Sequence, residues 1–287
     1  MTSPKIVAGL SALTDRYDVL LCDVWGVIHN GREAFPQACE ALARYRAEGG
    51  QVVLISNSPR PNPPVVEQLD GLGVPREAWS VLVTSGDATR KLLAERVPGP
   101  AWKLGPARDD ILYEGLGLDF TELPEARFIS CTGPFDDERE APEDYRERFC
   151  RATERKLPMI CANPDIVVQR GEKLIYCGGA LAQLYEALDG EVHMAGKPHA
   201  AIYELALAEA ERLRGGPVDR ARVLCIGDGP RTDLRGANAQ GLDVLFVANG
   251  IHGQEILAKG ALDVAMIDHV FETEGVTATW TVADLVW

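Results

Sequence analysis

The chain has 287 residues, of which 46% are hydrophobic and 25% charged, with a formal net charge of −14. This composition is typical of a globular protein with one large or two modest domains, and the acidic balance excludes nucleic acid and anionic membranes as main partners. The seven cysteines form no Cys-x-x-Cys pair, which argues against a zinc site and a disulfide framework. No window approaches the roughly 18 apolar residues of a membrane span, and the N-terminus lacks an apolar signal core, so we expect a cytoplasmic protein.

The first part of the chain alternates apolar runs with helical patterns. An apolar run at 20–22 ends in Asp23, and a β-branched run at 51–55 ends in Ser56. Between them, apolar residues at helical spacing occupy 34–48. A strand, a helix and a second strand in this order form a right-handed crossover, which places Asp23 and Ser56 at the same edge of one parallel sheet.

After a further helix and strand, the pattern changes beyond Pro98. Expected strands at 102–104, 128–131 and 159–162 are separated by helical and loop material, and this block extends to about Gly190. The pattern indicates a second α/β unit that is inserted into the first.

We therefore expect an α/β fold whose core is a doubly wound, Rossmann-like parallel sheet. Residues 1–87 and 191–287 would form this core, and residues 88–190 would form the inserted α/β domain. The first pattern returns after the insertion. Lys197 precedes a strongly periodic helix, and a new strand stops at Asp228.

These strand ends and helix starts carry a set of polar groups that suits phosphate chemistry. Two carboxylates at adjacent strand ends, Asp23 and Asp228, repel each other unless a cation lies between them, and Mg²⁺ takes such carboxylate ligands together with phosphate oxygens. The Ser56 hydroxyl and nearby backbone N–H groups could hold a phosphate, and Lys197 could neutralise its remaining charge. The set supports in-line attack of an Asp on phosphorus, which gives an aspartyl-phosphate that water hydrolyses.

The ordered set resembles the haloacid dehalogenase-like hydrolase superfamily over most of the chain. The insertion resembles the large α/β cap domain of the class IIA branch, which includes the nitrophenylphosphatase and pyridoxal-phosphate phosphatase types. The matching motifs are Asp-Val-Trp-Gly-Val (23–27), Leu-Ile-Ser-Asn-Ser (54–58), the lysine of Gly-Lys-Pro (196–198) and Gly-Asp-Gly-Pro-Arg-Thr-Asp (227–233), with Ala-Asn-Pro-Asp (162–165) and Gly-Gly-Ala-Leu (178–181) in the insertion.

The resemblance implies catalytic and metal-binding roles for five residues. Asp23 would be the nucleophile and a Mg²⁺ ligand, and the backbone carbonyl of Trp25 and the carboxylate of Asp228 would complete the protein's share of the metal shell. Lys197 would pair with Asp23 and the phosphate. Asp233 would hold metal-bound water or orient the lysine.

The same motifs suggest substrate-binding residues for a small phosphorylated metabolite. Ser56 would bind the phosphoryl group with backbone help from Asn57, and Ser58 closes that motif. Arg60 could reach a substrate anion, although an arginine in a proline-rich turn is usually only solvated. In the insertion, Asn163 and Asp165 either form a cap loop that faces the substrate or an Asn-Pro turn closed by an Asx hydrogen bond. A homodimer remains open.

The chain departs from the phosphatase pattern at Trp25, where the family normally has a second Asp that serves as general acid and base. An indole N–H cannot exchange a proton usefully near neutral pH, so turnover of esters with poor leaving groups should fall by ~10²–10⁴-fold. His29 is the nearest candidate for a substitute donor, although a histidine there is more often a loop residue with a satisfied ring. Two alternatives therefore stay open: a phosphometabolite-binding protein without turnover, and a hydrolase in which Asp23 attacks carbon, as in a dehalogenase.

Overall fold

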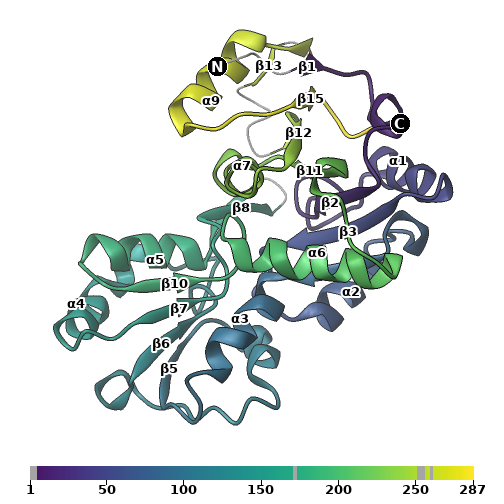
Figure 1. Cartoon of the computed structure of the whole chain (residues 1–287). Coiled ribbons are helices and arrows are strands. Elements are labelled where there is room, and N and C mark those ends of the chain that lie inside the picture. Colours follow the sequence, from purple (N-terminus) through teal and green to yellow (C-terminus); the bar gives the residue numbers. More distant parts are fainter. Residues whose placement is uncertain (1–4, 171–172, 251–255, 259–260) are drawn as a thin grey trace. The chain divides into compact units, whose positions relative to one another are not determined.

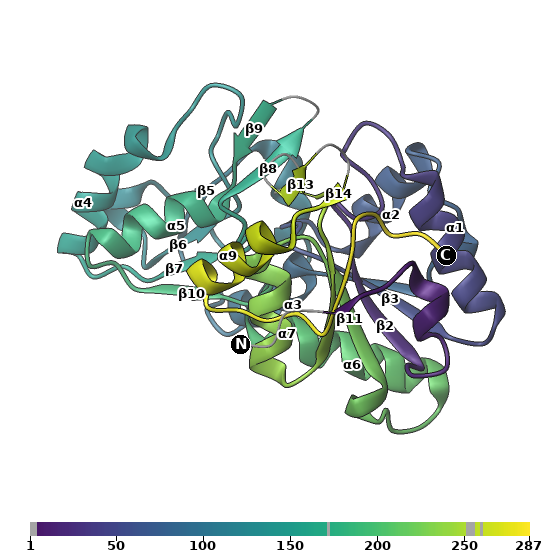
Figure 2. The same cartoon turned by 90° about the horizontal axis from the view of Figure 1, so that it is seen from above.

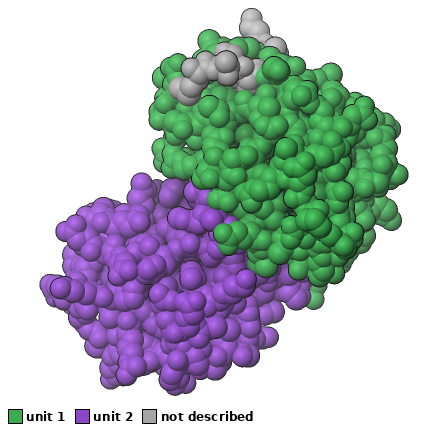
Figure 3. Space-filling model, in the orientation of Figure 1, with its two compact units in different colours: residues 1–56, 66–83, 203–287 green, residues 57–65, 84–202 purple. Residues whose placement is uncertain are grey.

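The computed structural model describes residues 5–170, 173–250, 256–258 and 261–287 (Figure 1). It has two compact units, shown in different colours in Figure 3. Unit 1 comprises residues 1–56, 66–83 and 203–287, and unit 2 comprises residues 57–65 and 84–202.

Unit 1 is built on a seven-stranded sheet with the order β1-β15-β12-β11-β2-β3-β4. The neighbours from β1 to β3 pair in parallel. The central strands β2 and β11 are buried at every position, which explains why their sequences are continuous apolar runs and not alternating ones. The strands are β1 (Lys5–Ile6), β2 (Val19–Asp23), β3 (Gln51–Ser56), β4 (Val81–Thr84), β11 (Val223–Gly227), β12 (Asp243–Val247) and β15 (Trp280–Val282).

The direction of travel through this sheet reverses between β2 and β11. The chain runs from β2 through β3 to β4 on one side, and from β11 through β12 to β15 on the other. Because parallel crossovers are right-handed, the connecting helices of the two halves cover opposite faces. Figure 2 shows α1 (Pro36–Ala47) and α2 (Asn62–Gly71) on one side of β2 and β3, and α6 (Ala200–Arg214) on the other. Ligands of such sheets bind at the carboxyl ends of the strands, where the order reverses.

The helices of unit 1 follow ordinary start and stop signals. Proline at the first turn of α1 requires no N–H partner, and the helix buries Ala38, Ala41, Leu42 and Tyr45 against the sheet side. The remaining helices are η1 (Leu10–Leu13), η2 (Arg76–Ala78), η6 (Arg220–Arg222), the π-helix η7 (Pro230–Leu234), α7 (Arg235–Gln240) and α9 (Val264–Glu274), and a short pair β13 (Leu257–Ala258) and β14 (Ala261–Leu262) precedes α9.

Unit 2 is a separate three-layer α/β unit around the parallel sheet β10-β7-β6-β5. Alternate side chains of its strands enter two cores: Ile129 and Met159 pack into one cluster with residues of α4 and α5, and Phe128 and Ile160 into another with residues of α3 and η3. Its elements are α3 (Ser85–Ala94), β5 (Ala101–Leu104), η3 (Ala107–Tyr113), η4 (Leu123–Glu125), β6 (Phe128–Cys131), η5 (Pro142–Tyr145), α4 (Arg146–Glu154), β7 (Met159–Cys161), the antiparallel hairpin β8 (Val167–Arg170) and β9 (Lys173–Tyr176), α5 (Gly178–Ala187) and β10 (Val192–Met194).

The doubly wound α/β architecture expected from the sequence is confirmed. The domain limits 1–87, 88–190 and 191–287 stay a prediction, and the compact units divide the chain elsewhere. Residues 84–87 and 191–202 belong to unit 2, where β10 pairs with β7. Among the described residues, no helix combines the length and the apolar character that a membrane crossing requires.

Candidate active site

Two strand ends at the switch point of unit 1 carry carboxylates. Asp23 is the last residue of β2, and Asp228 directly follows the last residue of β11. These strands are parallel neighbours with Cys22 opposite Ile226, so their carboxyl ends lie side by side. The pairing brings together two residues that are 205 positions apart in the chain (228 − 23).

Asp233 joins them from the π-helix η7, and the three residues form a compact acidic group. One carboxylate oxygen from each of Asp23, Asp228 and Asp233 lies within 4.8 Å of the others. All three are buried, with 4–7% of their surface exposed. Two like charges about 4 Å apart repel by about 4 kcal/mol at the effective dielectric of a protein surface. A buried all-oxygen set of this kind fits a hard divalent cation such as Mg²⁺.

Glycines allow the backbone to approach these carboxylates closely. Gly26 has φ +85°, and a Cβ there would lie 2.3 Å from Oδ2 of Asp228. Gly227 is equally restricted, because its Cβ would lie 2.2 Å from Cγ of Asp233. Oδ2 of Asp233 also accepts a hydrogen bond of 3.1 Å from the Gly229 N–H. Only glycine satisfies both the conformation and the space at residue 26.

Trp25 follows β2 by two residues and packs against its own loop. Its ring meets the ring of His29 edge-on at 5.1 Å between centroids. A Cβ on Gly31 would lie 2.5 Å from the indole. Glycine at position 31 therefore leaves room for the tryptophan.

His29 is a neutral structural residue near neutral pH. It is 2% exposed, and its Nδ1 accepts a hydrogen bond of 2.9 Å from the Gly31 N–H. Burial lowers its pKa to about 4. A ring with this pKa is a poor match for general acid catalysis at neutral pH, which disfavours the substitute role considered from the sequence.

Ser56 ends β3, the next strand of the same sheet. Its neighbour Ile55 lies opposite Asp23 in the parallel pairing of β2 and β3. Ser56 is 7% exposed. Unit 1 thus places the predicted hydroxyl one strand from the predicted nucleophile.

In unit 2, the Asn57 side chain connects three segments. Its Oδ1 accepts a hydrogen bond of 2.7 Å from the Lys197 N–H, and its Nδ2 donates to the Lys197 carbonyl at 3.1 Å and to Oδ1 of Asp165 at 2.8 Å. Lys197 is 2% exposed and Asn57 4%. The sequence suggested only backbone help from Asn57; this use of its amide was not predicted.

The other predicted substrate residues of unit 2 make local contacts. Oδ1 of Asn163 accepts a hydrogen bond of 3.1 Å from the Asp165 N–H, which is the Asx turn considered from the sequence. The Ser58 hydroxyl accepts one of 3.3 Å from the Arg60 N–H. Nε of Arg60 lies 4.0 Å from Oδ1 of Asp109, and Asp109 had no motif that singled it out.

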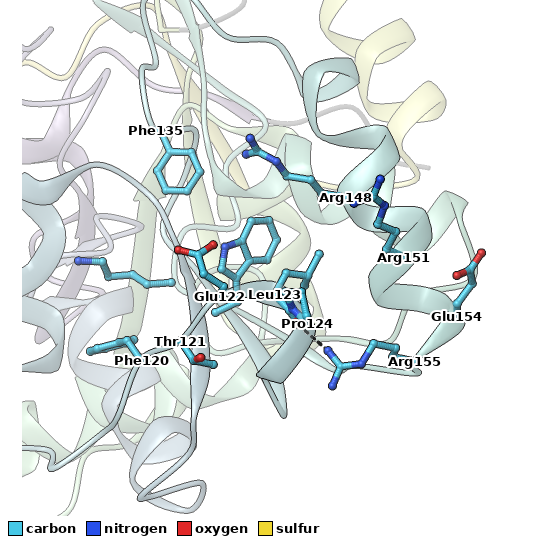
Figure 4. A pocket seen from close by; sticks show the side chains of 12 residues that line it. Phe120, Thr121, Glu122, Leu123, Pro124, Phe135, Arg148, Arg151, Glu154 and Arg155 are labelled. Atoms are coloured by element: carbon cyan, nitrogen blue, oxygen red, sulfur yellow. Dashed lines mark hydrogen bonds between the residues drawn. The ribbon is translucent and has the colours of Figure 1, made fainter.

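Unit 2 also has a cavity of about 960 Å³ with aromatic and basic walls (Figure 4). Figure 4 shows Phe120 and Phe135 on one side and Arg148, Arg151 and Arg155 on the other. Of the predicted site residues that the structure describes, none lines it. The cavity therefore shares no described lining residue with the predicted site.

Comparisons with known proteins agree with the geometry. Residues 20–119 match the family model of a haloacid dehalogenase-like hydrolase, and residues 194–273 match a model described as HAD-hydrolase-like. A haloacid dehalogenase-like hydrolase of known structure from Brucella suis is 47% identical with a TM-score of 0.88, covering 98% of this chain and 100% of that one. The 5'-nucleotidase YutF of Bacillus subtilis is 23% identical over 83% of this chain and 90% of its own length.

A solved structure of a glycerol phosphate phosphatase from Mycobacterium tuberculosis, in complex with calcium, shares the fold at 22% identity and a TM-score of 0.62, covering 83% of this chain and 68% of that one. The chain therefore belongs to the haloacid dehalogenase-like hydrolase family, in its class IIA branch.

Proposed function

We propose that this protein is a Mg²⁺-dependent phosphoric monoester hydrolase that cleaves a small phosphorylated metabolite through an aspartyl-phosphate. The observation that carries the proposal is the group of three buried carboxylates, Asp23, Asp228 and Asp233, at the switch point of the sheet. Family membership and the 5'-nucleotidase relative support a phosphate ester as the bond that is cleaved.

The acidic group would hold the cation. Asp23, Asp228 and the backbone carbonyl of Trp25 would be ligands, and Asp233 would hold its water or orient Lys197. The calcium in a solved structure of the same fold supports a divalent ion. When bound, the ion would neutralise charge on the carboxylates and the phosphoryl oxygens, so that an anionic nucleophile can approach phosphorus.

Asp23 would be the nucleophile. One oxygen of its carboxylate forms a bond to phosphorus on the side opposite the ester oxygen. The bond from phosphorus to the ester oxygen breaks, and its electron pair stays on the ester oxygen. The alcohol takes its proton from solvent, because Trp25 has none to give near neutral pH. Water then attacks the aspartyl-phosphate, which releases inorganic phosphate and restores the carboxylate.

The phosphoryl group would be held by neighbouring polar residues. The Ser56 hydroxyl and the Asn57 N–H would donate to its oxygens, with Ser58 beside them, and the Lys197 ammonium would balance its charge. Arg60, Asn163 and Asp165 are proposed for the remainder of the substrate.

The experiment is phosphate release from p-nitrophenyl phosphate with Mg²⁺ or with a chelator. We expect release only with Mg²⁺, and Asp23→Asn should abolish it because an amide cannot attack phosphorus. Asp15→Asn removes an exposed carboxylate of the same unit and should leave the rate unchanged.

The alternatives give different results in this assay. An unchanged rate in Asp23→Asn would overturn the assignment of the nucleophile. Hydrolysis of a haloacid in chelator would indicate attack on carbon, and thermal stabilisation by phosphate esters without any release would indicate a binding protein.

A further inference from the structure

The cavity of unit 2 drawn in Figure 4 is not used by the proposed phosphoryl transfer. Its volume of about 960 Å³ falls within the roughly 300–1,000 Å³ that small-molecule sites occupy. Its walls come from the edge strand β5, residues 120–124, Phe135 and the region of helix α4. All of these segments belong to unit 2, so the cavity lies within one compact unit.

One wall of the cavity presents aromatic rings to solvent. Phe120 and Phe135 are 42% and 39% exposed, and Figure 4 shows them on the same side of the cavity. Phe120 meets the buried Tyr113 edge-on at 4.8 Å between ring centroids. Phe135 lies 6.1 Å from the buried Tyr145. The two phenyl rings are thus supported from beneath while they stay exposed, and exposed apolar groups gathered at a cavity mark a binding site.

The opposite wall is basic. Arg148, Arg151 and Arg155 are three and four positions apart, so they share one face of the helix, and Figure 4 shows them across the cavity from the phenyl rings. Seven residues of helix rise about 10 Å. The three guanidinium groups therefore spread positive charge along a line of about that length.

Two of these arginines have no carboxylate to balance their charge. In the part of the chain that the structure describes, Arg148 forms no ion pair. Arg155 donates hydrogen bonds to the carbonyls of Leu123 and Ala126, the second at 2.8 Å. A carbonyl carries no net charge, so the guanidinium of Arg155 keeps its own.

The other basic groups of the lining are paired with carboxylates. Arg151 lies 2.6 Å from Glu147, but both side chains are largely exposed, so water weakens this pair. Lys103 bonds both oxygens of Asp110 at 2.8 Å and lies 5.7 Å from the centroid of the Phe120 ring, which it helps to hold. The lining as a whole has four basic and two acidic side chains, a balance of +2 (four minus two), in a chain of net charge −14.

This arrangement suits a ligand that has a flat aromatic ring and several anionic groups in a row. Guanidinium groups bind phosphates with two parallel hydrogen bonds, and a chain of phosphates can follow a line of arginines that a single phosphate cannot span. A nucleobase can stack on phenyl rings whatever its identity. A polynucleotide is repelled by the net charge of the chain, and a second copy related by a twofold axis would bring the same basic face against itself.

We propose that this cavity binds a nucleoside triphosphate, with its base against Phe120 and Phe135 and its phosphates along Arg148, Arg151 and Arg155. The site goes beyond the proposed function and does not depend on it, because every one of these residues belongs to unit 2 and none is proposed to hold or cleave the phosphate ester.

The test is isothermal titration calorimetry with adenosine 5'-(β,γ-imido)triphosphate, whose imido bond resists hydrolysis. A chelator is present, so that the three carboxylates of unit 1 have no cation between them and repel phosphates. AMP and tripolyphosphate are compared at matched ionic strength. For the wild-type protein we expect one saturable site whose Kd for the imido analogue is about tenfold or more below that for either, because AMP has one phosphate and tripolyphosphate has no ring.

Variants assign the two halves of the ligand to the two walls. Arg148→Met should raise the Kd of the imido analogue about tenfold, and Arg148→Lys should recover only part of the loss, because an ammonium lacks the planar fork. Phe135→Leu should weaken binding of the imido analogue about fivefold and leave that of tripolyphosphate unchanged. Arg146→Met is the matched control, because it removes an exposed arginine of α4 that pairs with Glu143 and does not line the cavity, and it should change neither Kd.

Each result supports or overturns the inference independently of the proposed function, which p-nitrophenyl phosphate hydrolysis with Mg²⁺ tests separately. Asp23→Asn should bind the imido analogue in chelator as the wild-type protein does, and a loss of binding in this variant would place the nucleotide at the acidic group instead. The inference also fails if the wild-type protein shows no saturable binding, if the three ligands bind equally, or if Arg148→Met behaves like Arg146→Met. A dimer that Arg148→Glu dissociates, without any nucleotide binding, would make this face an interface between copies and would overturn the inference as well.

Discussion

At the scale of single residues, Trp25 distinguishes this chain from the phosphatase pattern. Its indole packs against the His29 ring on one side and lies close to Gly31, where a side chain would clash with it. The side chain is half-buried and has these two contacts, so a change there alters chemistry and packing together. His29 offers no replacement acid, because burial lowers its pKa to about 4.

Trp25→Asp should raise turnover of alkyl phosphates. A carboxyl group at this position could protonate the leaving alcohol, an effect worth about 10²–10⁴-fold in other enzymes. The gain should be much smaller for p-nitrophenyl phosphate, whose leaving group needs no proton. Steady-state kcat for both esters measures this, and Trp25→Phe controls for the loss of the indole N–H. No gain in a variant that still melts cooperatively would contradict our account of the missing proton donor.

His29 should also make stability depend on pH. Its folded-state pKa of about 4 lies below the ordinary value of 6.5, so the unfolded chain binds the proton more readily. The contribution is fully present above pH 6.5 and is lost as pH falls through 4, by an amount on the order of 3 kcal/mol. Denaturant unfolding at pH 7 and pH 4.5 should show a smaller loss in His29→Gln than in the wild-type protein. His269→Gln changes an exposed histidine and should behave like wild type.

At the scale of elements, the buried strands of the core sheet could be predicted from the sequence, and the short, partly exposed strands could not. The strands that carry Asp23, Ser56 and Asp228 are apolar runs because parallel strands are covered on both faces. The hairpin β8–β9 and strand β10 are short and largely half-buried or exposed, so they lack such runs. Helix α9 has the usual start and stop signals, since Asp263 caps its start and Gly275 follows its end.

Replacing Asn57 tests the connection between elements of unit 2. Asn57→Ala would leave the buried Lys197 backbone groups without this amide, so we expect a loss of about 2–3 kcal/mol in unfolding free energy. Asn238 is a matched control, because its amide likewise bonds both backbone groups of one residue, Thr277, but is exposed. Asn238→Ala should cost about 1 kcal/mol or less, since water replaces its bonds. If denaturant unfolding gives equal losses of unfolding free energy for the two variants, burial of Asn57 does not increase the stability that its hydrogen bonds contribute.

At the scale of the whole molecule, the acidic group should couple cation binding to folding. An ion that binds only the folded protein adds about 2.7 kcal/mol of stability at a concentration 100 times its Kd. Mg²⁺ should therefore raise Tm, and a chelator should reverse the rise. Asp228→Asn relieves repulsion among the three carboxylates, so it should melt at or above the wild type without Mg²⁺ and gain less when Mg²⁺ is added.

Asp15→Asn provides the comparison for this effect, because it removes the same charge from an exposed position of unit 1. Its Mg²⁺-dependent rise in Tm should equal that of the wild-type protein at matched ionic strength. If Asp228→Asn gains as much from Mg²⁺ as Asp15→Asn does, the cation binds elsewhere.

The sequence by itself determined the parallel α/β architecture, the family and the positions of Asp23, Ser56 and Asp228 at strand ends, because buried parallel strands need continuous apolar runs and polar residues mark where those runs stop. Only the tertiary structure showed that Asp233 lies beside the other two carboxylates, that the Asn57 side chain bonds the Lys197 backbone, and that Asp109 and Asp137 pair with arginines. These relations join segments far apart in the chain. The distances between these side chains are set by the packing of elements against one another, and local sequence patterns do not specify that packing.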